Sequence, residues 1–193
     1  MMLIEAGANW RVRGSCNRTV AHYCADTGNT TLLEYIGRQS EDELRDLCTE
    51  RDDTDSTALH CACRAGGVRM LHLLMPIVDL SSRDGAGRSV LYLAVLSRSL
   101  PAVQLLTDHG ASLSSEEMER ATEDLILHNV SPGYIISLLQ LLKDPSLLDA
   151  FCSSVYNLPT APNLAGETYV YKKLLPKLSV PENVVILTEI KFR

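Results

Sequence analysis

The sequence has few aromatic residues and no long apolar run. Of its 193 residues only two are Phe and one is Trp, although 46% are hydrophobic. This composition suits helices that pack closely through Leu, Ala and Val. Because no stretch of about 18 apolar residues occurs, the sequence predicts no membrane-spanning helix. The start of the chain lacks the positively charged residues and the apolar run of a secretory signal peptide. We therefore expect a cytoplasmic protein, with a nuclear location as the alternative.

The sequence also lacks a disulfide framework and a basic excess. Its six cysteines have no characteristic spacing, which predicts free thiols in a reducing compartment. The formal net charge is −6, and the segment 41–55 alone, with eight acids and two arginines, accounts for it. The remainder is neutral and offers no basic face for phosphates, so we expect no nucleic-acid partner. We expect the acidic segment itself to form a long, solvated loop, with a docking site as the alternative.

A short motif returns three times along the chain. T-V-A-H begins at Thr19, T-A-L-H at Thr57 and S-V-L-Y at Ser89, at intervals of 38 and 32 residues. In the first two copies a glycine, Gly28 or Gly66, stands six residues after the histidine, and an apolar stretch follows every copy. Such self-similarity predicts a stack of helix pairs, an architecture that binds other proteins far more often than it catalyses.

The motif resembles the ankyrin repeat, G-x-T-P-L-H-x-A-A-x-x-G followed by a helix that ends in L-L-x-x-G-A. The likeness is carried by hydroxyl, histidine, leucine and glycine positions: Thr19, His22, Gly28, Thr57, Leu59, His60, Gly66, Ser89, Leu91 and Gly110. It implies an all-α ankyrin-repeat solenoid, in which the hydroxyl residue caps a helix and the histidine bonds within and between repeats. Gly28 and Gly66 should be left-handed, and Arg98, at the same place in the third copy, should cost about 1 kcal/mol. No copy has the proline after Thr, which marks the repeats as divergent.

The sequence divides into four segments. Residues 1–13 resemble the tail of a repeat without its first helix, which we interpret as an N-terminally truncated stack. Residues 14–114 hold the repeats, and 115–143 predict two helices that form a degenerate repeat and close the stack. Trp10 is the candidate contact for a target protein, because tryptophan is enriched among binding hot spots. Packing of Trp10 onto the next repeat is the alternative. Residues 144–193 have no repeat pattern.

The segment 144–193 resembles a degenerate SOCS box. That module has a helix of the form S-L-x-x-L-C-x-x-x-I, which enters a groove on Elongin C, and a later L-P-x-P element that faces a cullin. The matching positions are Leu148, Phe151, Cys152, Val155 and Tyr156 for the Elongin-type contact, and Leu178, Val180 and Pro181 for the cullin-type contact. The resemblance implies a substrate-recognition adaptor of an Elongin B/C–cullin ubiquitin ligase. The alternative is a plain binding scaffold, with the C-terminal helix as a structural cap.

No group of residues has the spacing of a catalytic or metal site. Cys61 and Cys63 are two residues apart, and on a helix they point to opposite sides, so one ion cannot hold both. His72, His109 and His128 have no partner at catalytic spacing. We therefore predict that the protein is not an enzyme and has neither a cofactor nor a metal ion.

Overall fold

The computed structural model describes residues 9–128, 130–142, 144, 146–147 and 150–151. These residues form helices and loops, and the only β-type pairing among them is a single bridge between Arg83 and Ser89. The chain divides into two compact units after Ala111. None of the helices in the described ranges is long and apolar enough to cross a lipid bilayer.

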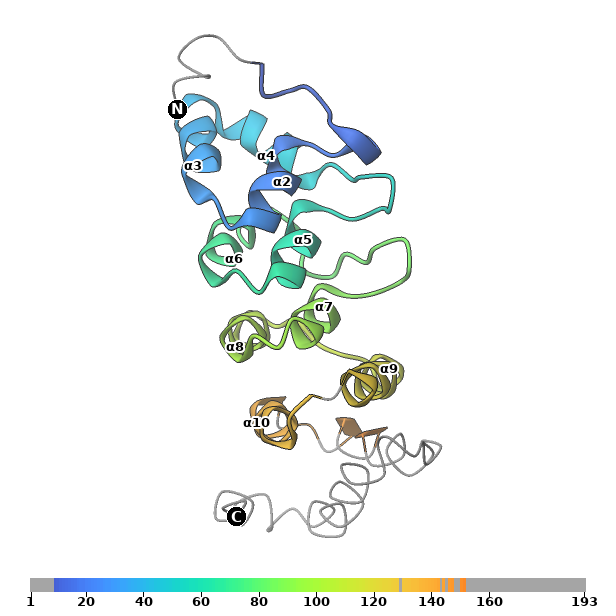
Figure 1. The fold of residues 1–193 in the computed structure, drawn as a ribbon. Helices are drawn as coiled ribbons and strands as arrows, with labels where there is room; N and C mark the ends of the chain where they lie inside the picture. Colours follow the sequence, from blue (N-terminus) through green and yellow to red (C-terminus); the bar gives the residue numbers. More distant parts are fainter. Residues whose placement is uncertain (1–8, 129, 143, 145, 148–149, 152–193) are drawn as a thin grey trace. The chain divides into compact units, whose positions relative to one another are not determined.

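The unit that ends at Ala111 is built from helix pairs. Its helices are the 3-10 helix η1 (Ser15–Asn17) and α2 (Val20–Thr27), α3 (Thr30–Gln39), α4 (Glu41–Thr49), α5 (Ala58–Ala65), α6 (Val68–Leu74), α7 (Val90–Leu96) and α8 (Leu100–Asp108). Helices α2, α5 and α7 contact one another in one column, and α3, α6 and α8 form a second column beside it (Figure 1). Each copy of the motif therefore begins a helix pair, as the sequence predicted.

The first helix of each pair begins and ends where the motif predicted. Helices α2, α5 and α7 follow Thr19, Thr57 and Ser89, all in extended backbone conformation. Gly28 and Gly66 end α2 and α5 in the left-handed region, each with φ of 69°. Only a residue without a Cβ adopts that conformation without strain, which explains why glycine stands there.

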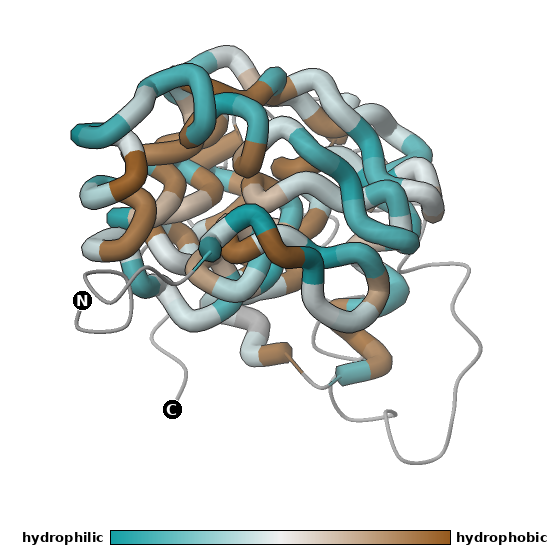
Figure 2. Tube along the Cα trace, turned by 90° about the horizontal axis from the view of Figure 1, so that it is seen from above, coloured by the Kyte–Doolittle hydropathy of each residue, from teal (hydrophilic) through white to brown (hydrophobic). Residues whose placement is uncertain are grey.

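The core lies between the two columns. Helices α5 and α7 are buried over most of their length and α2 over one face, and Ala58 to Cys63 in α5 are all inaccessible to solvent. The second helices bury one apolar stripe each, with Leu33, Leu71 and Leu106 fully covered. Hydrophobic and hydrophilic stretches alternate along the chain (Figure 2). This pattern is that of a stack whose inner column is enclosed by its neighbours and by the outer column.

Small sulfur-containing side chains fill much of this core. Cys24, Cys48, Cys61 and Cys63 are all free thiols and buried. Burial raises the pKa of Cys24 to about 11 and that of Cys48 to about 12. Burial raises the pKa of Cys63 as well. These thiols remain protonated at neutral pH and act as small apolar residues.

The acidic segment 41–55 is not the loop that we predicted, because its first nine residues form α4. Ser40 caps this helix by accepting a hydrogen bond from the Glu43 backbone N–H at 3.3 Å. The acidic side chains of the first turn interact favourably with the positive end of the helix dipole. Leu44 packs so close to Gly37 of α3 that a Cβ at Gly37 would lie 2.9 Å from a Leu44 methyl carbon. The apolar spacing of Leu44 and Leu47 was the helix signal that the charge obscured.

The unit that begins at Ser112 contains the two further helices that the sequence predicted. They are α9 (Ser115–Leu127) and α10 (Pro132–Leu142). The N-terminus of α9 is a capping box, in which Ser114 Oγ accepts from the Glu117 N–H at 3.2 Å and the Glu117 carboxylate accepts from the Ser114 N–H at 3.2 Å. That this pair closes the stack stays a prediction.

Candidate protein-binding surface

Two loops that connect the helix pairs are each organised by one buried aspartate. Asp52 Oδ1 accepts from the backbone N–H groups of Thr54 and Ser56, at 2.8 and 3.1 Å. Asp84, 32 residues later, accepts from the N–H groups of Ala86 and Arg88 at 3.0 and 2.9 Å. Burial alone raises the pKa of each aspartate, but these hydrogen bonds outweigh it, so both pKa values lie below the ordinary one. Both loops are therefore held by charged carboxylates that accept hydrogen bonds from the loop backbone.

Successive loops are joined to one another by backbone hydrogen bonds. The Asp53 N–H donates to the Cys16 carbonyl at 3.0 Å, and the Gly85 N–H donates to the Thr54 carbonyl at 2.9 Å. Arg51 adds a side-chain link, donating to the Arg83 carbonyl at 2.8 Å. The loops thus form a ladder beside the inner column (Figure 1). A ladder of this kind fixes the positions of the inner helices that begin directly after each loop.

His22 joins the first repeat to the loop of the second. Its Nδ1 accepts from the Thr19 N–H at 3.2 Å, which places the ring proton on Nε2, and Nε2 donates to the Ser56 carbonyl at 2.9 Å. Burial lowers the pKa of His22, with the Ser56 carbonyl and the Asp52 charge acting in the opposite direction. The bonds within and between repeats that the resemblance implied are present here.

His60 reproduces only half of this arrangement. Its Nδ1 accepts from the Thr57 N–H at 3.2 Å. Its buried Nε2 has no partner within hydrogen-bond distance in the described part of the chain. The backbone of Ser82 and the charge of Asp84 favour protonation at longer range, but burial dominates and lowers the pKa of His60. The third copy has Tyr92 at this place, and Ser89 Oγ accepts from its backbone N–H at 3.2 Å.

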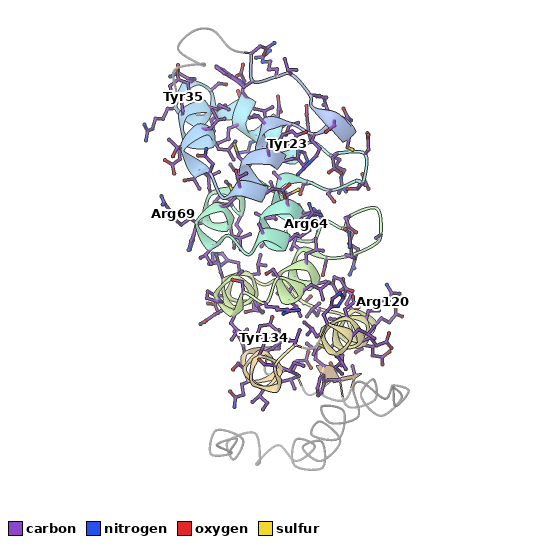
Figure 3. The ribbon with its side chains drawn as sticks, viewed as in Figure 1. Tyr23, Tyr35, Arg64, Arg69, Arg120 and Tyr134 are labelled. Atoms are coloured by element: carbon purple, nitrogen blue, oxygen red, sulfur yellow. The ribbon has the colours of Figure 1, made fainter. Side chains whose placement is uncertain are left out.

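Four side chains of the first two repeats form a surface on α2 and α5 that we call the inner-helix surface: Arg18, Tyr23, Asp26 and Arg64. Arg18 Nη2 donates to Asp26 Oδ2 at 2.5 Å, and the Arg18 guanidinium lies over the Tyr23 ring, 4.8 Å from its centroid. Arg64 Nη2 lies 3.5 Å from the other Asp26 oxygen. Figure 3 shows Tyr23 on α2 and Arg64 on α5, the next helix of the same column.

The Cys61 thiol lies beneath this surface. Its Sγ accepts from Arg18 at 3.2 Å and from Arg64 at 3.3 Å, and the side chain is inaccessible to solvent. Burial raises the pKa of Cys61, although both arginines act in the opposite direction. The thiol therefore serves as a weak acceptor for two guanidinium groups and is not a nucleophile.

Trp10 lies in the segment that precedes η1, partly exposed. Its indole Nε1 donates to Glu43 Oε2 in the first turn of α4 at 3.0 Å, and Arg11 pairs with the other carboxylate oxygen. Hydrogen bonds from Arg11 and from Trp10 lower the pKa of Glu43. The contact ties the N-terminal segment to the inserted helix. The role of Trp10 as a target contact stays a prediction.

The predicted residues of the C-terminal module lie mostly outside the described residues. These are Leu148, Cys152, Val155, Tyr156, Leu178, Val180 and Pro181. Phe151 is described and is 1% exposed within the chain. Among the described side chains, no three His, Cys, Asp or Glu gather in a way that could hold a metal ion.

Sequence reasoning missed the inner-helix surface, although a signal for part of it was present. Asp26 and Arg64 each stand seven residues after the hydroxyl residue of their motif copy, so they occupy the same position of successive repeats. Opposite charges at equivalent positions of stacked repeats indicate a contact across the repeat boundary. Arg18 and Tyr23 gave no such signal, because their contact depends on how the loop before α2 folds back.

The repeats belong to a known class. Residues 22–117 match the family model of ankyrin repeats, in three copies. This part of the chain is therefore an ankyrin-repeat stack, and such stacks are protein–protein interaction scaffolds.

The chain is also similar to the putative palmitoyltransferase ZDHHC13 of Danio rerio, with 30% identity over 123 residues. The similar region makes up 62% of this chain but only 18% of that protein, so the chain spans less than a fifth of its relative. The activity in the relative's name is a property of that protein.

Proposed function

We propose that the inner-helix surface binds a partner protein. The observation that carries this proposal is that Tyr23 has 39% of its surface exposed and Arg64 has 47% of its side chain exposed, on the inner helices α2 and α5 of successive repeats. Tyrosine and arginine are the residue types enriched at the energetic centres of protein interfaces. An exposed pair of this kind does not contribute to the core, so its position on the inner column favours a role in recognition.

The surroundings of the surface support the same function. The loop ladder and the His22 bridge hold the start of α2 and α5 in place, and Asp26 links the two helices through Arg18 and Arg64. A surface held in this way loses little conformational entropy when a partner binds. Buried hydrogen bonds next to the exposed side chains thus hold the inner-helix surface in one conformation before a partner binds.

The test compares two matched double variants of the full chain in cells. Tyr23→Ser with Arg64→Glu changes the inner-helix surface, and Tyr35→Ser with Arg69→Glu makes the same changes on the outer helices α3 and α6, which Figure 3 shows on the other column. Co-purifying proteins are quantified for both variants and for the wild type. We expect a specific partner to be lost with the first variant and retained with the second. Equal retention by both variants would contradict the proposal.

A more specific function is that of a ubiquitin-ligase adaptor, in which the repeats hold a target and the C-terminal segment recruits Elongin B/C and a cullin. What supports it is the resemblance of Leu148 and Cys152, with the later L-S-V-P run, to the two elements of a SOCS box. The N–H of Ser146 donates to Asp144 Oδ1 at 2.9 Å, an arrangement suited to the start of the required helix. Catalysis would belong to the recruited partners.

Co-expression with Elongin B/C tests the adaptor role. We expect a stoichiometric complex with the wild type and none with a Leu148→Ala, Cys152→Phe double variant. Leu127→Ala, at a 60% exposed position of α9, is the control for the loss of a leucine and should keep the complex. Absence of a complex with a wild type that circular dichroism shows to be folded would leave the repeats as a binding scaffold without ligase recruitment.

A further inference from the structure

Two arginines share the single carboxylate of the inner-helix surface, and they share it unequally. Asp26 lies 2.5 Å from Arg18 but 3.5 Å from Arg64. Arg18 is further fixed by the Tyr23 ring, by the Cys61 thiol and by Asp52 Oδ2 at 3.8 Å, and its side chain is only 18% exposed. Asp26 is therefore the partner of Arg18, and its contact with Arg64 is weak.

Arg64 keeps most of its hydrogen-bonding capacity. A guanidinium group has five N–H donors in a planar fork. In the described part of the chain, both contacts of Arg64, with Asp26 and with the weak acceptor Cys61, are made by Nη2. The Nε and Nη1 groups have no partner among the described residues, and nearly half of the side chain is exposed. Nε and Nη1 can therefore each donate to a further acceptor that approaches from solvent.

We infer that Arg64 anchors an acidic side chain, Asp or Glu, in a linear segment of the bound partner. This inference rests on the proposed function and names the partner's chemistry. A carboxylate accepts a charge-assisted hydrogen bond from Nε or Nη1, and Asp26 already pairs with Nη2 of the same guanidinium. A doubly charged phosphate fits less well, because the Asp26 carboxylate lies against the same guanidinium and repels two charges more strongly than one.

The position next to Arg64 along the column suggests a second contact of the segment. Leu96 stands seven residues after Ser89, as Arg64 does after Thr57, and it is partly exposed on α7. The order of equivalent positions is then acidic, basic and apolar: Asp26, Arg64 and Leu96. Packed helices lie about 8–10 Å apart and an extended chain advances about 3.5 Å per residue, so a segment with an acidic residue about three positions from an apolar one would place the first on Arg64 and the second on Leu96.

The experiment uses the full chain and fluorescein-labelled peptide mixtures with one fixed central position, Glu, Gln, Lys or phosphoserine, between randomised residues. Binding is measured by fluorescence anisotropy. We expect the Glu mixture to bind about tenfold more tightly than the Gln mixture, a difference of about 1.4 kcal/mol. Arg64→Gln should remove this preference, and Arg69→Gln, an exposed arginine on α6, should keep it. Asp26→Asn removes the competing carboxylate and should strengthen the preference for Glu.

Each other outcome has a defined meaning. If the wild type binds the Glu and Gln mixtures equally, the inference is wrong while a protein-binding function stands. A preference for Glu that survives Arg64→Gln would assign the acidic contact to another residue and overturn the inference. Tighter binding of phosphoserine than of Glu would overturn the choice of a carboxylate. If no mixture binds a chain that circular dichroism shows to be folded, the linear acidic segment is refuted, and the cellular comparison decides the proposed function separately.

Discussion

Replacing the histidine of the first and of the second motif copy by leucine, one at a time, tests how much the hydrogen bond between repeats contributes to stability. His22 and His60 occupy the same position of successive repeats, are both inaccessible to solvent, and each accept from the N–H of the preceding threonine at 3.2 Å. They differ in one bond, because only His22 also donates to a carbonyl of the next loop, that of Ser56 at 2.9 Å. Leucine fills much of the same volume without any polar atom.

The expected magnitudes follow from these bonds. In both variants the threonine N–H is left buried without its acceptor, at a cost of about 2 kcal/mol. His22→Leu also removes the bond to Ser56, whose side chain and backbone are fully buried, which adds about 1 kcal/mol. We therefore expect His22→Leu to lower the free energy of unfolding by about 3 kcal/mol and His60→Leu by about 2 kcal/mol.

Urea denaturation followed by circular dichroism measures the difference. It is performed at neutral pH, where burial keeps both imidazoles uncharged because it lowers the pKa of His22 and of His60. The denaturant dependence of the free energy should be the same in both variants, which shows that the same cooperative unit unfolds. Equal costs, or a larger cost for His60→Leu, would refute the reasoning that the His22–Ser56 bond stabilises the stack.

Three further outcomes are expected. Burial lowers the pKa of His22 and of His60 below 6.5, so the unfolded chain binds more protons than the folded chain at acidic pH. The contribution of these histidines to stability should be complete above pH 6.5 and should be lost as the pH falls through their folded-state pKa values. A pH series of thermal unfolding measures this loss, and the double variant His22→Leu, His60→Leu, which should not show it, is the control. Gly85→Ala places a Cβ 2.8 Å from a backbone oxygen of the neighbouring loop and should lower the free energy of unfolding by about 1 to 3 kcal/mol. Gly133→Ala in α10 meets no atom within 4 Å and should leave the free energy of unfolding unchanged or raise it. Similar losses of stability in both variants would contradict the loop ladder. Arg98→Gly should raise the free energy of unfolding by about 1 kcal/mol, because Arg98 has a φ of 61°, and a decrease would show that its side chain matters more than its backbone strain.

Local sequence patterns specify the helix pairs and their ends. The hydroxyl residues before α2, α5 and α7 and the left-handed Gly28 and Gly66 are local features, since a cap and a positive φ depend on one or two neighbouring residues. The same holds for Arg98, whose left-handed backbone the motif register predicted. The class of fold followed, because a period of this size can bury its apolar stripes only by stacking.

Contacts between distant segments determine how the acidic segment packs and which side chains meet. The spacing of Leu44 and Leu47 favours a helix locally, but the packing of Leu44 against Gly37 of α3, which places α4 in the fold, is a tertiary contact. The inner-helix surface joins Arg18, from the loop before α2, to Arg64, at the end of α5. These residues are 46 positions apart, and a single carboxylate, Asp26, connects them. Such contacts depend on the register between repeats, which loop hydrogen bonds set and which no local pattern in the chain encodes.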